Sequence, residues 1–369
     1  MRAVRQPKLR TRNLRKTYGP VVALAGASFE VEEAEFLTLL GPSGSGKTTM
    51  LLTIAGLVQP DSGEVWIDGC LATYAPPHRR DIGMVFQSYA LFPHLSVFEN
   101  IAFPLRMRGM NETDIRRQVG SALDLVQLPE VGNRLPRALS GGQQQRIALA
   151  RCIVYRPSIV LMDEPLGALD RKLRDQMKLE IKRLHTELGI TVLYVTHDQE
   201  EAMIMSDRVC LMNDARIEQI GTPADLYFLP GSVFAADFIG ESNLLSVKVA
   251  SVDGSDVMLN AAAGALLKAK LKAGRTVNIG ATMQLMVRPE MLRVLEPGAD
   301  ADNILEARLS DVILVGGVTK TYARLADGAL VSATGLTCGP PCAIEKNARV
   351  RLGWTKENGV LLPQLECTA

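Results

Sequence analysis

Eight residues near the N-terminus have the types and the spacing of a phosphate-binding loop. The run Gly41-Pro42-Ser43-Gly44-Ser45-Gly46-Lys47-Thr48 fits the pattern G-x4-G-K-[S/T]. Its glycines let backbone N–H groups point inward at phosphate oxygens, and a helix that begins at the loop adds a positive partial charge. We expect Lys47 to contact the β- and γ-phosphates of a nucleotide and the Thr48 hydroxyl to ligate Mg²⁺.

Two adjacent carboxylates, Asp163 and Glu164, follow the apolar run Ile159–Met162. In an open α/β sheet, ligands bind at the carboxyl ends of the strands. Asp163 can hold Mg²⁺ directly or through water, and Glu164 can polarise a water molecule aimed at the γ-phosphate. An Asp-Glu pair after a strand, taken alone, more often caps a helix. Its combination with the phosphate loop favours the catalytic interpretation.

A second anion site is predicted at Leu139-Ser140-Gly141-Gly142-Gln143, which precedes the helical pattern Gln144–Tyr155. A serine and two glycines at a helix start can bind phosphate oxygens. Taken alone, Ser140 is better interpreted as an ordinary helix N-cap. A second phosphate site in this chain makes sense if it serves a nucleotide that another copy holds.

These residues resemble the ATP-binding subunits of ABC transporters, in the family's order over about residues 8–240. Leu139–Gln143 is identical to the family's signature sequence. The resemblance implies that Tyr18 stacks on adenine and that Gln87 links Mg²⁺ and the attacking water to the transporter interface. It also implies that His197 is the switch histidine that contacts the γ-phosphate. The run Gly167-Ala168-Leu169-Asp170 resembles the loop that crosses the dimer interface, through Ala168, Leu169 and Asp170.

The resemblance further implies a homodimer that sandwiches two ATP molecules head to tail. Each nucleotide would contact Tyr18, Gly41, Pro42, Ser43, Gly44, Ser45, Gly46, Lys47, Thr48 and Thr49 of one copy and Ser140, Gly141, Gly142 and Gln143 of the other. The catalytic residues would be Glu164, His197, Gln87 and Lys47, and the Mg²⁺ ligands Thr48, Gln87 and Asp163. Three positions depart from the family pattern: Ala34 and Ala215 replace turn glycines, and Gly167 replaces a serine.

The elements that must position these residues are those of an α/β fold. Short apolar runs followed by turn and helix patterns, as at Phe36–Leu40 and Val192–Val195, predict a mainly parallel sheet within an ATPase domain over residues 1–240. A charged, Leu-rich stretch predicts a helical subdomain over about residues 95–155. Thr222-Pro223 predicts a helix start, and Pro230-Gly231 its end. Short strands separated by turns predict an all-β domain over residues 241–369.

Composition excludes several other classes of protein. The 369 residues are 47% hydrophobic and 22% charged, with a formal net charge of +1, so neither disorder nor nucleic-acid binding is indicated. No apolar stretch approaches the roughly 18–20 residues that span a bilayer, and the basic start Met1–Lys16 lacks the apolar segment of a secretory signal. Cys338 and Cys342 have no second cysteine pair or histidine nearby, so no zinc site is predicted.

The resemblance also bears on the transporter. The C-terminal β domain resembles the OB-like (TOBE-type) regulatory or dimerisation domain of bacterial importer ATPases. Met84–His94 and Asp237–Leu245 look most like the spermidine/putrescine importers, while ferric-iron, sulfate and sugar or glycerol-phosphate importers are alternatives. A soluble ABC ATPase outside transport is a further alternative. A pure binding module is disfavoured because Glu164 and His197 are both present.

An importer ATPase implies partners and a location. The partners would be two integral-membrane permease subunits and an extracytoplasmic solute-binding protein, with this chain peripheral at the cytoplasmic face of the inner membrane. We expect Gln87–Val97 to lie at the rim of a groove that receives a permease helix, with exposed apolar side chains at Tyr89, Leu91, Phe92 and Phe98. The alternative is that these side chains pack the helical subdomain onto the sheet.

Overall fold

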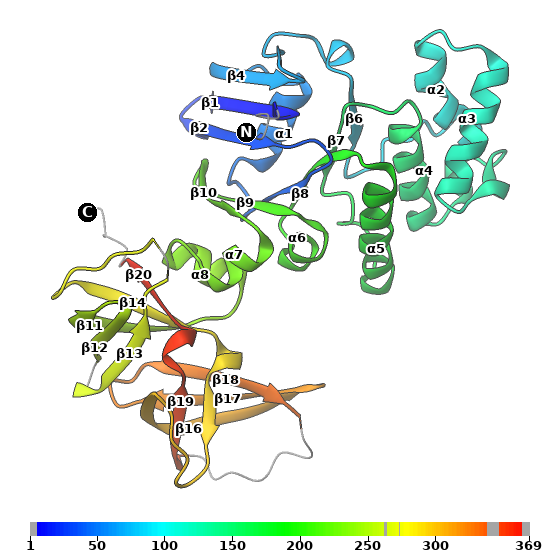
Figure 1. Cartoon of the computed structure of the whole chain (residues 1–369). Coiled ribbons are helices and arrows are strands. Elements are labelled where there is room, and N and C mark those ends of the chain that lie inside the picture. Colours follow the sequence, from blue (N-terminus) through cyan, green and yellow to red (C-terminus); the bar gives the residue numbers. More distant parts are fainter. Residues whose placement is uncertain (1–5, 262–263, 273, 338–346, 364–369) are drawn as a thin grey trace. The chain divides into compact units, whose positions relative to one another are not determined.

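The computed structural model describes residues 6–261, 264–272, 274–337 and 347–363. Cys338, Cys342 and Cys367 lie outside the described residues. The chain forms two compact units, Met1–Pro223 and Ala224–Ala369, whose secondary structure is shown in Figure 1. Within the described residues, every helix is too short or too polar to cross a membrane.

A six-stranded sheet forms the centre of the first unit, in the order β10-β9-β3-β8-β7-β6. Its bounds are β3 (Phe36–Leu40), β6 (Ile82–Val85), β7 (Ile159–Asp163), β8 (Thr191–Thr196), β9 (Arg208–Asn213) and β10 (Arg216–Gly221). The first five are parallel, and β10 is antiparallel at one edge. Every residue of β3 and β8 is buried, as expected for strands covered on both faces. The predicted α/β class is confirmed.

A second sheet in this unit was not predicted. It is antiparallel, in the order β2-β1-β4-β5, with bounds β1 (Leu9–Tyr18), β2 (Val21–Val31), β4 (Ser62–Ile67) and β5 (Cys70–Leu71). One face packs with β3 and helix α1 (Lys47–Ala55) into a shared hydrophobic core that includes Leu9, Leu24, Leu39 and Met50. The other face carries charged side chains, so these strands lack the continuous apolar runs of the central sheet.

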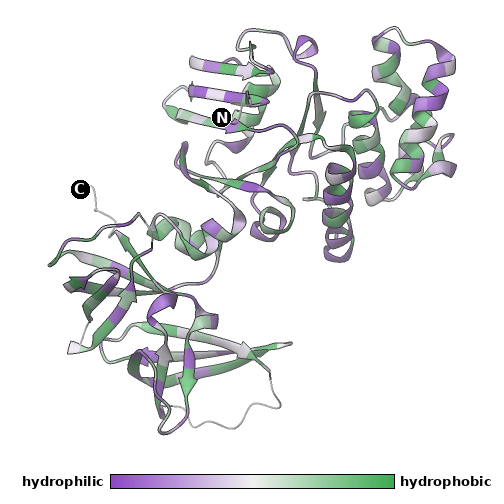
Figure 2. Ribbon diagram, viewed as in Figure 1, coloured by the Kyte–Doolittle hydropathy of each residue, from purple (hydrophilic) through white to green (hydrophobic). Residues whose placement is uncertain are grey.

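The helical subdomain contains α2 (Val97–Met107), α3 (Glu112–Leu125) and α4 (Gly141–Ile153). Ser96 and Asn111 cap the first two helices through side-chain hydrogen bonds. The helices α5 (Arg171–Leu188) and α6 (Gln199–Met205) follow β7 and β8. Figure 2 shows α5 as largely hydrophilic, and its apolar residues Met177, Ile181 and Leu184 are buried.

The segment Gln87–Val97 differs from expectation. Tyr89 is only 7% exposed, and Leu91, Phe92 and Phe98 are half-buried. The buried Asn100 holds the loop, because its side chain accepts the Phe92 N–H and donates to the carbonyls of Phe92, Leu95 and Ser96. Arg151 donates to the Tyr89 and Ala90 carbonyls. The expectation of four exposed apolar side chains is wrong. Tyr89 belongs to the core shared by the helical subdomain and the sheet, and Leu91 and Phe98 pack against that core, as the packing alternative states.

The second unit contains two antiparallel sheets of five strands each. The first is β13-β12-β11-β14-β20, with bounds β11 (Asn243–Asp253), β12 (Asp256–Ala261), β13 (Leu266–Lys270), β14 (Thr282–Val287) and β20 (Gly359–Pro363). The second is β15-β19-β16-β17-β18, with bounds β15 (Arg293–Leu295), β16 (Asn303–Val315), β17 (Val318–Leu325), β18 (Leu330–Leu336) and β19 (Arg349–Trp354). Both contribute to one hydrophobic core. The predicted C-terminal all-β domain is confirmed.

The helices α7 (Pro223–Phe228) and α8 (Val233–Ile239) pack with this second unit. Arg288 is 3% exposed and donates to the carbonyls of Tyr227, Ala236 and Gly240. These bonds satisfy a buried guanidinium with helix and linker carbonyls. Compactness therefore divides the chain at Pro223, whereas the sequence-based boundary lies near Gly240.

Candidate functional site

The phosphate-binding loop lies between the end of β3 and the start of α1. Gly46 has φ 99°, in the left-handed region, and a Cβ there would lie 2.2 Å from the Ala23 carbonyl oxygen. Only glycine fits this position without moving the strand β2. The Ser45 hydroxyl is buried and has no hydrogen-bond partner among the described residues. An anion bound in the loop would supply an acceptor for it.

Lys47, the first residue of α1, points back into this loop. Its side-chain ammonium donates to the carbonyls of Gly41 and Pro42, both at 2.8 Å, and the residue is 6% exposed. Burial lowers the pKa of Lys47, although the carboxylates Glu164 and Asp163 oppose that shift. An anion beside this ammonium would favour its charged form.

Asp163 ends β7 and faces the start of α1. The Thr48 hydroxyl donates to Asp163 Oδ1 at 3.3 Å. Burial raises the pKa of Asp163. A hydroxyl and a carboxylate are oxygen donors that suit Mg²⁺, which takes one or two carboxylates together with phosphate oxygens. Among the described residues no three His, Cys, Asp or Glu side chains gather as a metal site.

Glu164 and His197 meet at the carboxyl ends of two neighbouring strands. β7 and β8 are paired in parallel, and His197 Nδ1 lies 3.1 Å from Glu164 Oε1. The Glu164 N–H donates to the Val195 carbonyl at 3.0 Å, and this bond joins the end of β7 to β8. Glu164 has φ 43°, a strained conformation for a residue with a side chain, and such strain is typical of functional sites.

The residues of the second anion site lie at the start of α4. Ser140 caps this helix, and Ser140 and Gln143 exchange two hydrogen bonds in a capping box. A Cβ on Gly142 would lie 2.8 Å from Leu173 Cδ1, so glycine allows α4 to approach α5 closely. The structure thus shows the N-cap role of Ser140, and in the single chain the side chains of Ser140 and Gln143 each accept the backbone N–H of the other residue.

The predicted dimer-crossing loop leads into α5. Asp170 caps that helix by accepting the Leu173 N–H at 3.0 Å, while Ala168 is exposed and Leu169 is buried. A Cβ on Gly167 would lie 3.5 Å from the Glu164 carbonyl oxygen and 3.6 Å from Gln87 Nε2. Both are ordinary contacts, so packing does not require the glycine that replaces the family's serine.

Tyr18 ends β1 and is 49% exposed. The Lys16 ammonium lies 5.5 Å from the centre of its ring. The Asp61 carboxylate holds this end of β1, because it accepts hydrogen bonds from the Lys16 ammonium and from the backbone N–H and the hydroxyl of Thr17. An exposed aromatic ring at a fixed strand end is suited to stacking on a base.

The structure therefore brings five predicted residues together at the carboxyl ends of β3, β7 and β8: Lys47, Thr48, Asp163, Glu164 and His197. Sequence reasoning missed the residues behind His197. Thr196, Asp198 and Glu201 form a hydrogen-bonded cluster at the start of α6. The spacing of Asp198 and Glu201 fits a helix-capping pattern, which is the signal that could have identified them.

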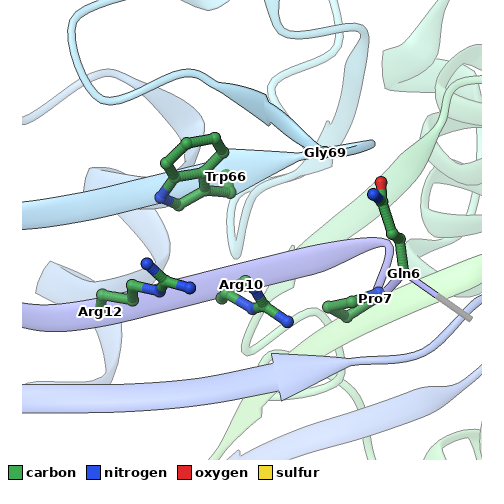
Figure 3. A pocket seen from close by; sticks show the side chains of 6 residues that line it. All are labelled: Gln6, Pro7, Arg10, Arg12, Trp66 and Gly69. Carbon is green, nitrogen blue, oxygen red and sulfur yellow. The ribbon is translucent and has the colours of Figure 1, made fainter. Parts of the chain in front are cut away.

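Two pockets lie elsewhere in the first unit. A groove of about 1200 Å³ is lined by α3 and by Asp81, Ser158 and Thr191, at the amino ends of β6, β7 and β8. A small pocket of about 190 Å³ lies on the antiparallel sheet and is lined by Gln6, Pro7, Arg10, Arg12, Trp66 and Gly69 (Figure 3). Arg10 pairs with Glu30, and the Trp66 indole N–H donates to Glu64. The Arg12 guanidinium lies 5.9 Å from the centre of the Trp66 ring.

Comparison with known proteins shows which families the sequence of this chain matches. Residues 24–167 match the ABC transporter family, and residues 285–362 match the TOBE domain. A spermidine/putrescine import ATP-binding protein of Rubrobacter xylanophilus is 46% identical, over 96% of this chain and 93% of its own length. A protein of the same description from Ruegeria pomeroyi is 47% identical, over 86% of each chain.

Solved structures agree with this placement. A dimeric bacterial ABC transporter cassette is 36% identical with a TM-score of 0.53, over 58% of this chain and 98% of the other. The cassette cbiO1 from Clostridium perfringens, part of an ABC transporter complex, is 28% identical with a TM-score of 0.56, over 63% of this chain and 92% of the other. By sequence, fold and the residues at the strand ends, the chain belongs to the ATP-binding subunits of ABC transporters.

Proposed function

We propose that this chain hydrolyses ATP at a site shared between two copies and thereby energises the import of a small solute. The contact of 3.1 Å between Glu164 and His197, beside Lys47 and Asp163, is the observation that carries the proposal. On this proposal Glu164 is the general base, His197 contacts the γ-phosphate and the Lys47 ammonium binds phosphate, all at one edge of the sheet. Phosphoryl transfer to water needs this kind of positioning and charge stabilisation more than covalent chemistry.

We assign each of these residues a role in ATP hydrolysis. The loop Gly41–Thr49 and the ammonium of Lys47 bind the phosphates, and Tyr18 stacks on the base. Glu164 orients and polarises the attacking water, while His197 and Gln87 contact the γ-phosphate and the water. Thr48, Asp163 and Gln87 would hold Mg²⁺, which neutralises phosphate charge when it is bound. The strain at Glu164 is in keeping with a carboxylate held in a set direction.

The second copy would complete each site. Ser140 and Gly141 are exposed at the start of α4, where backbone N–H groups and the helix dipole favour an anion. The related cassette with 36% identity is a dimer in two structures, one of them with bound ADP and phosphate. A head-to-tail homodimer would place Ser140–Gln143 of one copy on the nucleotide of the other, with Ala168, Leu169 and Asp170 crossing between them.

A permease helix would occupy the groove of about 1200 Å³ rather than the loop Gln87–Val97. The groove has an apolar floor with Leu105, Ala122 and Ile153, and charged residues of both signs at its rim, including Arg108 and Glu187. This composition suits an amphipathic helix. Docking there would keep the chain peripheral, at the cytoplasmic face of the cell membrane, beside two permease subunits and an extracytoplasmic binding protein.

The solute would be a polyamine. The two relatives compared above are described as spermidine/putrescine import proteins. A ferric-iron, sulfate or sugar importer is the alternative, because the permease and the binding protein select the solute. Purifying the complex through a tag on this chain would identify the binding protein. A pocket rich in Asp, Glu and aromatic residues suits a polycation. A tyrosine-rich iron site or an arginine-lined anion site would contradict the polyamine assignment and leave the ATPase assignment unchanged.

The substitution Glu164→Gln tests the ATPase proposal. It removes the base but keeps the side-chain shape, so the variant should bind ATP, form dimers in its presence, and turn over at least about a hundredfold more slowly. Light scattering with and without ATP measures the dimer, and phosphate release measures turnover. Glu130→Gln, at an exposed position of the helical subdomain, is the matched control and should behave as wild type. Near-normal turnover of Glu164→Gln would contradict the role of this carboxylate.

A further inference from the structure

We infer that Thr196 is a positioning residue that holds the backbone of His197, with the buried carboxyl of Glu201 as its anchor. The inference rests on the proposed contact of His197 with the γ-phosphate. It concerns how the chain aims that side chain, since His197 itself is 59% exposed and its ring contacts Glu164 at one nitrogen. Packing around so exposed a ring cannot set its direction, so the backbone that carries it must do so.

The Thr196 hydroxyl bridges the residues on either side of His197. Its Oγ1 accepts the N–H of Asp198 at 2.9 Å and donates to Glu201 Oε2 at 2.7 Å. The side chain of the residue before the histidine is therefore bonded to the backbone of the residue after it. This bond closes a tight turn around His197, at the point where β8 ends and α6 begins.

Glu201 gives the hydroxyl a fixed acceptor. The residue is 3% exposed, and the same Oε2 accepts the hydroxyl of the fully buried Tyr194 at 2.9 Å. Asp198 Oδ1 accepts the N–H groups of Glu200 and Glu201, at 2.8 and 3.2 Å. The turn around His197 and the first turn of α6 thus hold each other in place. With its acceptor fixed, the Thr196 hydroxyl has one orientation in which to receive the Asp198 N–H.

A second contact links this turn to the predicted dimer-crossing loop. Asp198 Oδ2 lies 3.6 Å from Arg174 Nη1, and Arg174 Nη2 donates to the Leu169 carbonyl at 3.1 Å. The cluster that holds His197 therefore connects to the start of α5. A displacement of His197 by about 1 Å can lower a rate about a hundredfold. Loss of the Thr196 bridge should therefore lower the rate of ATP hydrolysis, even where it changes the stability of the chain little.

The experiment compares three threonine variants of the full chain. Thr196→Val removes the bridge and keeps the shape of the side chain, so kcat for ATP should fall about 10- to 100-fold while KM stays within about twofold. Thr196→Ser restores the hydroxyl and should bring kcat back to within about threefold of wild type. Thr186→Val is the matched control, because the Thr186 hydroxyl donates to the Lys182 carbonyl on the exposed side of α5. It should leave kcat unchanged.

The double variant with His197→Ala separates positioning from folding. If Thr196 acts through His197, Thr196→Val should not lower kcat further once the imidazole is gone. Equal fold losses in the two backgrounds would overturn the inference, as would a Thr196→Val variant that turns over like wild type. Both outcomes leave the ATPase proposal standing, because wild-type turnover tests that separately. A wild-type chain without ATP turnover would overturn both proposals.

Discussion

At the scale of single residues, hydrogen bonds from neighbouring groups hold the side chains of the site in position. Lys47 is buried against its own loop, and Thr48 and Asp163 are hydrogen-bonded to each other. The end of β1 follows the same principle. The ammonium of Lys16, together with the Thr17 bonds, holds the pKa of Asp61 at about 2, well below its ordinary value. The exposed carboxylate keeps the strand end beside Tyr18 in one conformation.

Replacing Asp61 should reveal this through pH. Because the folded-state pKa of Asp61 lies below the unfolded value, its stabilisation is present above about pH 4 and is lost as the pH falls toward 2. Asp61→Asn should therefore lower the urea midpoint of unfolding at pH 6, and by about half as much at pH 3. Asp124→Asn, at an exposed position on α3, is the control. An Asp61→Asn effect of the same size at both pH values would argue against a charge-dependent role.

At the scale of elements, turns and caps place the functional segments. Ala34 has φ 58° and Ala215 has φ 62°, so both turns use the left-handed conformation that a glycine adopts without strain. Ala34 precedes β3, which delivers the phosphate loop, and its N–H donates to the Thr191 hydroxyl at the start of β8. The alanine at this turn costs stability without touching the residues proposed to act on ATP.

The substitution Ala34→Gly should therefore stabilise the chain by about 1 kcal/mol, because it removes the left-handed strain. Thermal unfolding should shift upward by about 2–4 °C for a unit of this size. Ala224→Gly provides the opposite case, since Ala224 is exposed within the helix α7 and glycine should lower stability there. A lower midpoint for Ala34→Gly would show that the turn does not hold the strain that its φ implies.

At the scale of the whole molecule, the proposed mechanism needs two chains. The phosphate loop and the Ser140–Gln143 segment lie in different parts of the first unit, on α1 and α4. In a head-to-tail dimer each nucleotide takes one segment from each chain. A substitution in the phosphate loop of one chain and a substitution in Ser140–Gln143 of the same chain then affect two different nucleotide sites.

Mixing two inactive variants tests this arrangement. Lys47→Ala and Ser140→Arg should each abolish turnover alone. In a mixed dimer one site carries both defects and the other carries none, so an equal mixture should regain about a quarter of wild-type turnover. Each variant mixed with itself is the control. If the mixture stays inactive although mixed dimers form, the head-to-tail arrangement is wrong or both sites must be intact.

The sequence by itself determined the α/β class, the C-terminal β domain and the transporter family, and all three are confirmed. Each depends on residues that are close in the chain. The strand Phe36–Leu40 and the helix start at Lys47 were predicted at the residues where the structure has them, because a buried parallel strand and a loop before a helix leave continuous local patterns. The roles assigned to the site residues, and the domain boundary near Gly240, stay predictions.

Only the tertiary structure decided which side chains are buried and which ones hold neighbouring segments through hydrogen bonds. Tyr89 is buried because Arg151, 62 positions later, donates to its carbonyl and Asn100 holds the loop after it. The antiparallel sheet pairs β1 with the distant β4, and the cluster behind His197 joins a strand to a helix. These features depend on contacts between segments with no common local pattern. Burial and hydrogen-bond partners exist only once the chain has brought such segments together.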